Sequence, residues 1–384
     1  MISLGIDQLF VHHRHLIQGR RIGLVSHYAM TDAALVPVID RLLTCNISQL
    51  VRLFGPEHGV LNAAREGEVV PRNHDRHSGL EAVSLYGPAK APDLTDLADL
   101  DALVIDLFDI GTRYYTNAST LYYTLQAAQQ AGTLAIVLDR PNPLGGVQRE
   151  GHLLEPQYQS FVGTLPVPIR HGLTFGEEAR LIQGEFFPDL MLEVVPVQGW
   201  SRAMLWPETG LPFVSPSPNT THFDMALLYP GTCLFEGTNV SVGRGTTHPF
   251  EWIGAPWIDG HQLAAWFNAQ EIPGVRARPV YFTPWRSLYA GELASGVQLH
   301  ITAPHRVHSL KTGVTLLSGI YTLYPDAFQF TSEDDDRIPF FDLLAGGPKL
   351  REAILEQAVT DYFDEEAEIH ADFVARTRQY FLYQ

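Results

Sequence analysis

The sequence contains few cysteines and few basic residues. Only two of its 384 residues are cysteines, Cys45 and Cys233, so no disulfide framework is implied, and no Cys-x-x-Cys pair is present for zinc. Lysine and arginine number 26 against 43 aspartates and glutamates, which gives a formal net charge of −17. Contacts with phosphate backbones need clustered basic side chains, so this balance argues against nucleic acid as a partner. A small anion, which needs only a local arginine, is still compatible with it.

Long apolar segments are also missing. No window of about 20 apolar residues is present, so we expect no membrane insertion. Residues 1–7 lack a basic stretch followed by a long apolar run, so no signal peptide is visible. We therefore expect a cytoplasmic protein, or a secreted or periplasmic one if a leader has been trimmed. The sequence gives no indication of the oligomeric state.

The chain is too long for one ordinary hydrophobic core, and two domains are expected. In the first part, apolar runs at 21–26, 50–54, 101–107 and 134–138 alternate with helical segments such as 119–131. This alternation predicts an α/β fold with a Rossmann-like parallel sheet. We place this domain at residues 1–224, and a smaller α+β domain that completes an active-site cleft at residues 225–384.

The smaller domain is expected from a change of pattern after about residue 250. An apolar strand at 297–301 and helices at 310–324 and 350–362 are predicted there. The acidic run at 333–336 is expected to be a solvated loop. Further back, Thr31-Asp32 is a candidate cap for a helix that carries Leu35, Ile39 and Leu42.

Polar residues follow each of the four predicted parallel strands. The carboxyl ends of parallel strands share one edge of the sheet, where open α/β sheets bind ligands, so these residues should converge. Neither Gly-x-Gly-x-x-Gly nor Gly-x-x-x-x-Gly-Lys-Ser/Thr is present, which argues against a nucleotide, and we expect no cofactor. The converging residues are Ser26, His27, Glu57, His58, Asp109, Arg113, Tyr114, Tyr115, Asp139, Arg140 and Asn142.

Glu57 and His58 stand at the sharpest of these strand ends. Gly55-Pro56 breaks the buried strand 50–54, since proline cannot donate to the sheet. A turn with two exposed polar residues explains the pair equally well. A structural reading is also available for Glu177, because Thr174 and Glu177 have capping-box spacing.

Two further polar segments are candidates for binding. Residues 66–78 are long enough to be an active-site loop. The segment 229–247 combines glycine, threonine and asparagine with Glu236, Asn239 and Arg244, which suits hydrogen bonding to a polar ligand. An irregular junction between domains is the alternative for this second segment.

These motifs resemble the NamZ family of exo-β-N-acetylmuramidases, formerly a domain family of unknown function. The resemblance implies a Rossmann-like domain, a smaller second domain and a cleft between them. It also implies release of N-acetylmuramic acid from the non-reducing end of peptidoglycan fragments. The matching segments are 55–59 (Gly-Pro-Glu-His-Gly), 84–87, 106–116, 138–146, 150–151, 169–174, 216–219, 229–239, 243–247 and 254–257.

Glycoside hydrolysis needs an acid for the leaving oxygen and a group that meets the oxocarbenium-like centre. Glu57 is our candidate acid, because burial beside an apolar strand would favour its protonated form, and the family resemblance points to the same residue. His58 is expected to orient Glu57 or the sugar. The second group is left open between the substrate's own acetamido group and four carboxylates: Asp109, Glu236, Glu68 and Asp139.

The lactyl carboxylate of N-acetylmuramic acid suits an arginine fork. Arg113 and Arg244 are the first candidates, followed by Arg140 and Arg170, although ion pairing with the abundant acids explains each of them as well. Other residues are expected to contact the sugar, with core packing or turn formation as their structural alternatives. These are Tyr114, Tyr115, Asn142, Asn219 and Asn239.

Two other classes of protein are compatible with the sequence. A metal-dependent hydrolase could use His27, His58, His74 and Asp109, although no tight ligand spacing supports it and we expect no metal. A muramyl-sugar-binding protein without catalysis also fits a two-domain cleft.

Overall fold

A computed structural model of the chain describes residues 2–332 and 338–384, and the acidic run 333–336 lies outside the described residues. The first half contains a sheet of order β3-β4-β2-β1-β5-β6-β7, in which every pair except β3–β4 is parallel. This confirms the predicted α/β class and the four predicted strands. The bounds are β1 Arg21–Val25, β2 Gln49–Gly55, β3 Asn73–His74, β4 Glu81–Ser84, β5 Ala102–Ile105, β6 Leu134–Leu138 and β7 Leu192–Val195.

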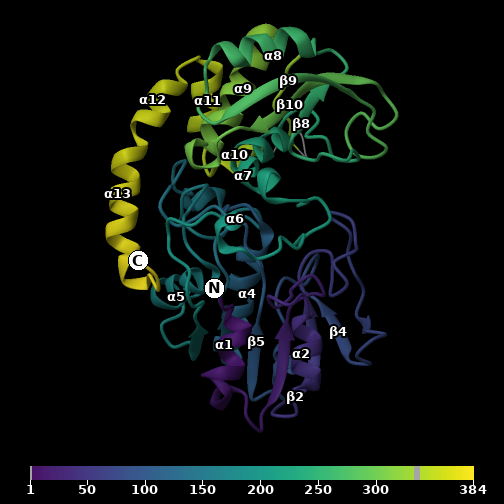
Figure 1. Cartoon of the computed structure of the whole chain (residues 1–384), viewed down its shortest axis with the longest axis vertical. Coiled ribbons are helices and arrows are strands. Elements are labelled where there is room, and N and C mark those ends of the chain that lie inside the picture. Colours follow the sequence, from purple (N-terminus) through teal and green to yellow (C-terminus); the bar gives the residue numbers. More distant parts are fainter. Residues whose placement is uncertain (1, 333–337) are drawn as a thin grey trace.

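Helices cover both faces of this sheet (Figure 1), which explains why β5 and β6 are apolar throughout. In β5, Ala102 and Val104 pack in the same core as α1 and α2, whereas Leu103 and Ile105 pack in a second core with α4 and α5. The helices of this half are α1 Gly5–Val11, α2 Val38–Thr44, α3 Leu94–Leu97, α4 Thr116–Ala131, α5 Phe175–Glu185 and α6 Trp206–Thr209.

The predicted start of the second helix is wrong. α2 begins at Val38, and Thr31-Asp32 does not cap it. The Asp32 carboxylate instead accepts hydrogen bonds from the amides of Ala34 and Val36, both at 2.9 Å, and so closes a turn before the helix. Asp and Asn side chains compete for nearby backbone donors in this way, and sequence spacing alone does not separate a turn from a cap.

The second half contains a three-stranded antiparallel sheet of order β8-β10-β9 with helices around it. The predicted helix 350–362 is two helices, interrupted near Gln357, whose φ is +56°. The strands are β8 Trp252–Ala255, β9 Val275–Phe282 and β10 Ala294–Ile301. The helices are α7 Phe223–Thr232, α8 Gly260–Ala269, α9 Ser309–Leu323, α10 Phe340–Ala345, α11 Lys349–Leu355, α12 Val359–Asp364 and α13 Glu366–Thr377.

Two helices of the second half, α7 and α9, cross at very close range. A Cβ on Gly231 of α7 would lie 2.0 Å from the Ser309 carbonyl oxygen of α9, so only glycine fits there. Short 3₁₀ turns are also present among the described residues. They are η1 Arg14–Leu16, η2 Pro156–Tyr158, η3 Cys233–Gly237, η4 Pro304–Arg306 and η5 Arg378–Tyr380.

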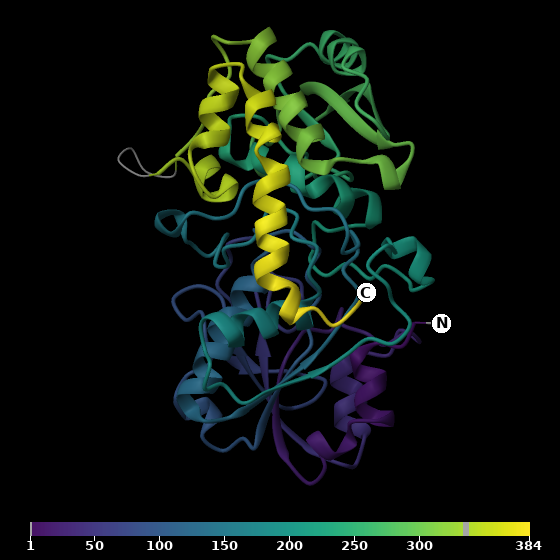
Figure 2. The same ribbon diagram turned by 90° about the vertical axis from the view of Figure 1, so that its left-hand side faces the viewer.

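The end of the chain returns to the first sheet. Figures 1 and 2 show α13 running from the smaller half down the side of the larger one. The Tyr383 hydroxyl then donates to Asp139, at 2.5 Å, and accepts from the Val197 amide, at 2.8 Å. The proposed boundary at residue 224 therefore separates the two sheets, but the last residues pack against the first of them.

None of the described helices is long and apolar enough to cross a lipid bilayer. The cellular compartment stays a prediction.

Candidate active site

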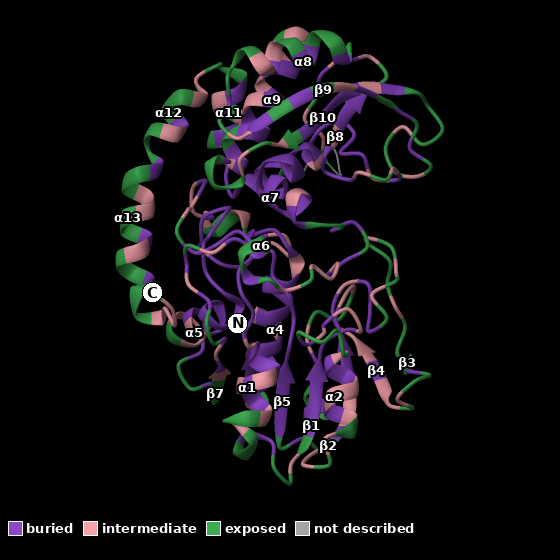
Figure 3. Ribbon diagram, viewed as in Figure 1, coloured by how far each residue is buried: buried purple, intermediate pink, exposed green. Residues whose placement is uncertain are grey.

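A cavity of about 630 Å³ lies at the carboxyl edge of the parallel sheet, and residues of both halves line it. Its volume falls in the range of about 300–1,000 Å³ that is usual for small-molecule sites. Figure 3 shows buried residues in both halves, among them those of β1, β2 and β5 in the larger half and of α7 in the smaller one. The predicted site residues that line it are Glu57, His58, Tyr114, Tyr115, Asn219, Glu236 and Arg244.

Glu57 projects into the cavity from the loop that follows β2. The loop turns back so tightly that a Cβ on Gly55 would lie only 2.5 Å from the Val60 amide nitrogen. The Glu57 carboxylate accepts from the Thr116 hydroxyl, at 2.8 Å, and from the Gly67 amide, at 3.3 Å. We expected Glu57 to be buried, but its side chain is only half-buried. The buried strand ends before this residue, and the loop opens to the cavity.

His58 has a left-handed backbone, with φ +71°, and a buried imidazole. Its Nδ1 lies 2.8 Å from the Ala64 carbonyl oxygen, which can only accept, so Nδ1 carries the proton. This bond ties the ring to its own loop. A direct hydrogen bond between His58 and Glu57, one of the two expected roles, is absent from the described residues.

Three carboxylates line the cavity, and two of them are ion-paired. Arg286 Nη1 lies 2.6 Å from both Glu66 oxygens, and Arg244 Nε lies 2.5 Å from Glu236. Burial is the largest single influence and raises the pKa of Glu66, but the hydrogen bonds to the carboxylate and the charges of Arg286 and Arg244 together outweigh it, so the net shift is downward. Among the described residues that line the cavity, Glu57 is the carboxylate without an ion pair.

Arg244 reaches the cavity from the segment between η3 and β8. Its guanidinium lies 3.8 Å from Glu66 and 5.0 Å above the Phe250 ring. Burial lowers the pKa of Arg244, but the neighbouring Glu236 carboxylate outweighs it, so the pKa is raised and the charge is secure. A fixed cation thus faces the cavity, held by one carboxylate and an aromatic ring.

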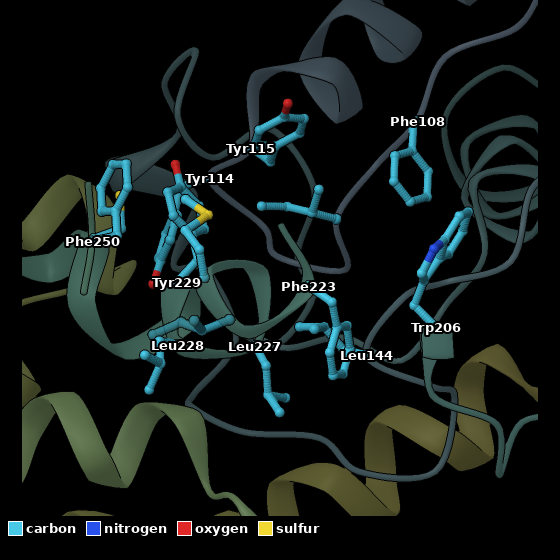
Figure 4. Close-up of a cluster of buried hydrophobic side chains, with 14 of the residues drawn as sticks. Phe108, Tyr114, Tyr115, Leu144, Trp206, Phe223, Leu227, Leu228, Tyr229 and Phe250 are labelled. Atoms are coloured by element: carbon cyan, nitrogen blue, oxygen red, sulfur yellow. The ribbon is translucent and has the colours of Figure 1, made fainter. Parts of the chain in front are cut away.

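Tyr114 and Tyr115 both line the cavity, at the start of α4. Their rings meet Tyr229 at centroid distances of 5.7 and 6.2 Å, and Figure 4 shows the three rings with Phe250 at one side of the cluster. The Tyr114 hydroxyl donates to the Pro230 carbonyl, which links the two halves. Burial raises the pKa of both hydroxyls, so both are protonated donors.

Asn219 lines the cavity beside a residue that the sequence analysis missed. Its Oδ1 accepts from Arg286 Nη2, at 3.2 Å, and its Nδ2 lies 3.4 Å from Glu66. Arg286 lies in the connection between β9 and β10, outside every motif that was singled out. Thr116, the donor to Glu57, was also missed, although the matched segment 106–116 contains it.

Arg113 does not line the cavity. It is fully buried, and its guanidinium donates to the carbonyls of His152, Val167 and Leu344 at 2.8–2.9 Å. These bonds join the two halves. The expectation that Arg113 contacts a sugar acid is therefore replaced by a structural role.

Asn142 and Asn239 also lie outside the cavity lining: turn formation accounts for Asn142, and bonds to a distant segment account for Asn239. Asn142 accepts from the Leu144 amide, at 2.9 Å, and donates to the Leu173 carbonyl, at 2.8 Å. Asn239 donates to the Ala327 carbonyl, at 2.8 Å, and accepts from the Gln329 amide, at 2.9 Å. Both amides are thus engaged with the backbone, and the turn that the sequence left open as an alternative is found at Asn142.

Asp109 is buried away from the cavity, in a cluster with His171 and Glu178. His171 Nε2 lies 3.1 Å from Asp109 and 3.3 Å from Glu178. His171 Nδ1 accepts from the Leu173 amide, so Nε2 carries the proton. Burial, and then the charge of Asp109, raise the pKa of Glu178 well above its usual value. The three ligand atoms lie within 4.8 Å of one another, but a protonated Nε2 does not suit a metal ion.

The predicted metal ligands do not form one group. Of that set, only Asp109 belongs to the buried cluster just described, whereas His74 is exposed on β3. His27 is fully buried, and burial lowers its pKa to about 3, so its imidazole is neutral. The described residues thus give the metal-dependent alternative no site of the predicted composition.

The remaining candidates are engaged elsewhere. Arg140 pairs with Asp106 at 2.5 Å, and Arg170 pairs with Glu150 at 2.7 Å. Asp139 is fully buried and binds the amide of Gly176, at 2.7 Å; burial raises its pKa to about 6. Glu68 accepts from the Arg65 amide, at 3.0 Å, and is exposed. Of the four candidate second carboxylates, only Glu236 lines the cavity.

The parallel sheet, the smaller second half and a cavity whose described lining includes one carboxylate without an ion pair are compatible with a two-domain α/β glycoside hydrolase. Comparison with known families makes the assignment specific. The model described as the N-terminal part of exo-β-N-acetylmuramidase NamZ matches residues 22–224, and the model of its C-terminal part matches residues 227–383. The chain therefore belongs to the NamZ family of exo-β-N-acetylmuramidases. Because this is a family of enzymes, the alternative of a binding protein without catalysis is not supported.

Individual relatives agree with this assignment. The chain is 42% identical over 353 residues to the peptidoglycan β-N-acetylmuramidase NamZ of Bacillus subtilis, covering 92% of this chain and 84% of the relative. Two crystal structures of DUF1343 family proteins from Bacteroides fragilis also match over 100% of this chain and 99% of theirs. They superpose with TM-scores of 0.90 and 0.74, at 34% and 26% identity.

Proposed function

We propose that this enzyme releases N-acetylmuramic acid from the non-reducing end of peptidoglycan fragments, with Glu57 as the general acid. The observation that carries the proposal is the pairing of the cavity carboxylates. A general acid must be able to hold and release a proton, and an ion pair with arginine keeps a carboxylate ionised. Glu66 and Glu236 are paired in this way, whereas among the described residues Glu57 has only a hydroxyl and an amide as partners.

Arg244 is the residue that we propose for the lactyl carboxylate. It lines the cavity, its charge is secure, and Glu236 holds its Nε at 2.5 Å while its Nη1 lies 3.8 Å from Glu66. Glu236 then positions Arg244. A pocket that combines a fixed cation with a carboxyl group proposed as the acid matches a sugar that carries both an acid substituent and a scissile glycosidic oxygen.

Turnover of a chromogenic β-N-acetylmuramide, beside its N-acetylglucosaminide analogue, tests the proposal. We expect the wild type to cleave the muramide, and Glu57→Gln to lower kcat about 100- to 10,000-fold, because glutamine cannot protonate the leaving oxygen. The matched control is Glu356→Gln, which alters an exposed carboxylate next to α11. A folded Glu57→Gln enzyme with wild-type turnover would refute the acid assignment.

A further inference from the structure

An exposed tryptophan stands in the connection between β9 and β10. Trp285 is 70% exposed, the highest value among the exposed large hydrophobic side chains of the described residues, and Leu288 and Leu293 of the same connection are exposed as well. This connection projects from the smaller sheet at the right of Figure 1. An indole in water leaves a large apolar surface unburied, and such surfaces often mark binding sites.

Trp285 is nevertheless held firmly by its backbone. Its amide donates to the Gly245 carbonyl, at 2.9 Å, next to Arg244 of the cavity lining. Gly245 has φ +78°, and a Cβ there would lie 2.5 Å from the Arg286 carbonyl oxygen, so the two segments are in direct contact. Trp285 is thus fixed beside the residue that we assign to the lactyl group.

The side chain of the next residue connects the indole to the cavity. The guanidinium carbon of Arg286 lies 5.2 Å from the centre of the Trp285 ring. The same guanidinium binds Glu66 and Asn219, which both line the cavity. Arg286 therefore links the indole to two residues of the cavity lining, and the exposure of Trp285 leaves ring surface open to a ligand that extends out of the cavity.

We infer that Trp285 is the stacking platform for the sugar on the leaving side of the scissile bond. This rests on the proposed function, in which the terminal N-acetylmuramic acid occupies the cavity and the rest of the chain extends outward. The next sugar is an N-acetylhexosamine, whose axial C–H groups form an apolar face. Such a face packs on an indole and removes apolar surface of both from water.

Calorimetric binding to the Glu57→Gln enzyme and to its Trp285→Ala double variant tests the platform without need of turnover. The two ligands are the disaccharide N-acetylmuramyl-β-1,4-N-acetylglucosamine and free N-acetylmuramic acid. We expect loss of the indole to weaken disaccharide binding about tenfold, the effect of a single stacking contact. Binding of the monosaccharide stays unchanged, because it fills only the cavity, and Trp285→Tyr retains most of the disaccharide affinity.

Tyr281→Ala is the matched control, since this aromatic side chain on β9 is 59% exposed but lies 6.3 Å from the His261 ring of α8, on the helix-covered side. The platform would be refuted if the Glu57→Gln enzyme and its Trp285→Ala double variant bound the disaccharide with equal affinity. A parallel loss for both ligands, which would place Trp285 in the muramic acid subsite, would also refute it. Failure of the proposed function shows separately, as absence of muramide turnover by the wild type.

Discussion

Arg244 and Arg286 decide which carboxylates of the cavity are held ionised. Each cation is matched by a glutamate, Glu236 at 2.5 Å and Glu66 at 2.6 Å, so neither adds net charge to the cavity. Partly buried charges persist in this way only when they are paired and hydrogen-bonded. Among the described residues Glu57 has no such cation beside it, and this difference is the basis of its proposed role as the acid.

Arg244→Lys is the residue-scale test of lactyl recognition. Lysine keeps a positive charge beside Glu236 but lacks the planar fork that binds a carboxylate through two hydrogen bonds. We expect kcat/KM for the muramide to fall about 10- to 100-fold, the value of one or two charge-assisted bonds. The basal rate on the N-acetylglucosaminide, which has no lactyl group, provides the control. A proportional loss on both substrates would show that Arg244 has a general structural role instead.

At the scale of elements, the start of α5 connects a helix to the sheet edge. The predicted capping box is present: the Thr174 hydroxyl accepts from the Glu177 amide, and Glu177 accepts from the Thr174 amide. The same hydroxyl donates to Asp139, at 2.8 Å, directly after β6. One side chain thus caps the helix and holds a buried carboxylate at the end of the strand.

Thr174→Ala removes both bonds and should destabilise the enzyme by about 1–2 kcal/mol, as loss of an N-cap does. Denaturant unfolding of the two proteins measures the difference. Thr174→Ser keeps the hydroxyl and should stay near the wild type, which separates the hydrogen bonds from the lost methyl group. Wild-type stability of the alanine variant would contradict the capping role.

At the scale of the whole molecule, the C-terminal segment ties the two halves together. α13 contacts the larger half through His370, whose Nε2 lies 2.9 Å from the Gly151 carbonyl, and through Arg376, which donates to the Pro166 carbonyl at 2.8 Å. Tyr383 then reaches Asp139 beneath the carboxyl edge of the sheet. The cavity, built from both halves, depends on ties of this kind outside its own lining.

Tyr383→Phe should destabilise the enzyme by about 1–3 kcal/mol, because it removes one hydrogen bond from the buried Asp139 carboxyl and leaves the Val197 amide without its hydroxyl partner. The loss should be larger at about pH 8 than at about pH 5. Burial raises the pKa of Asp139 to about 6, so at the lower pH the folded enzyme holds it protonated and the bond to a carboxylate matters less. Unfolding curves at the two pH values measure this, and an equal loss at both would refute the assigned partner.

Local patterns were sufficient for most of the fold. The apolar runs and the Gly-Pro break after β2 gave the strands and the Glu57 loop, because both depend on neighbours in the sequence. The site was predicted less completely. Arg113 was a reasonable candidate for an anion, yet it bonds to the Leu344 carbonyl, 231 residues away. Arg286 was missed because its partner Glu66 is 220 residues distant, and no spacing signals such a pair.

The sequence by itself determined the alternation of strands and helices, the family and the loops that converge at the sheet edge, since backbone preferences and apolar periodicity act over a few residues. Only the tertiary structure decided which polar side chains face the cavity, which carboxylates are neutralised by arginine, and where Trp285 stands. Those outcomes depend on the direction of each side chain and on contacts between segments far apart in the chain, and local sequence encodes neither.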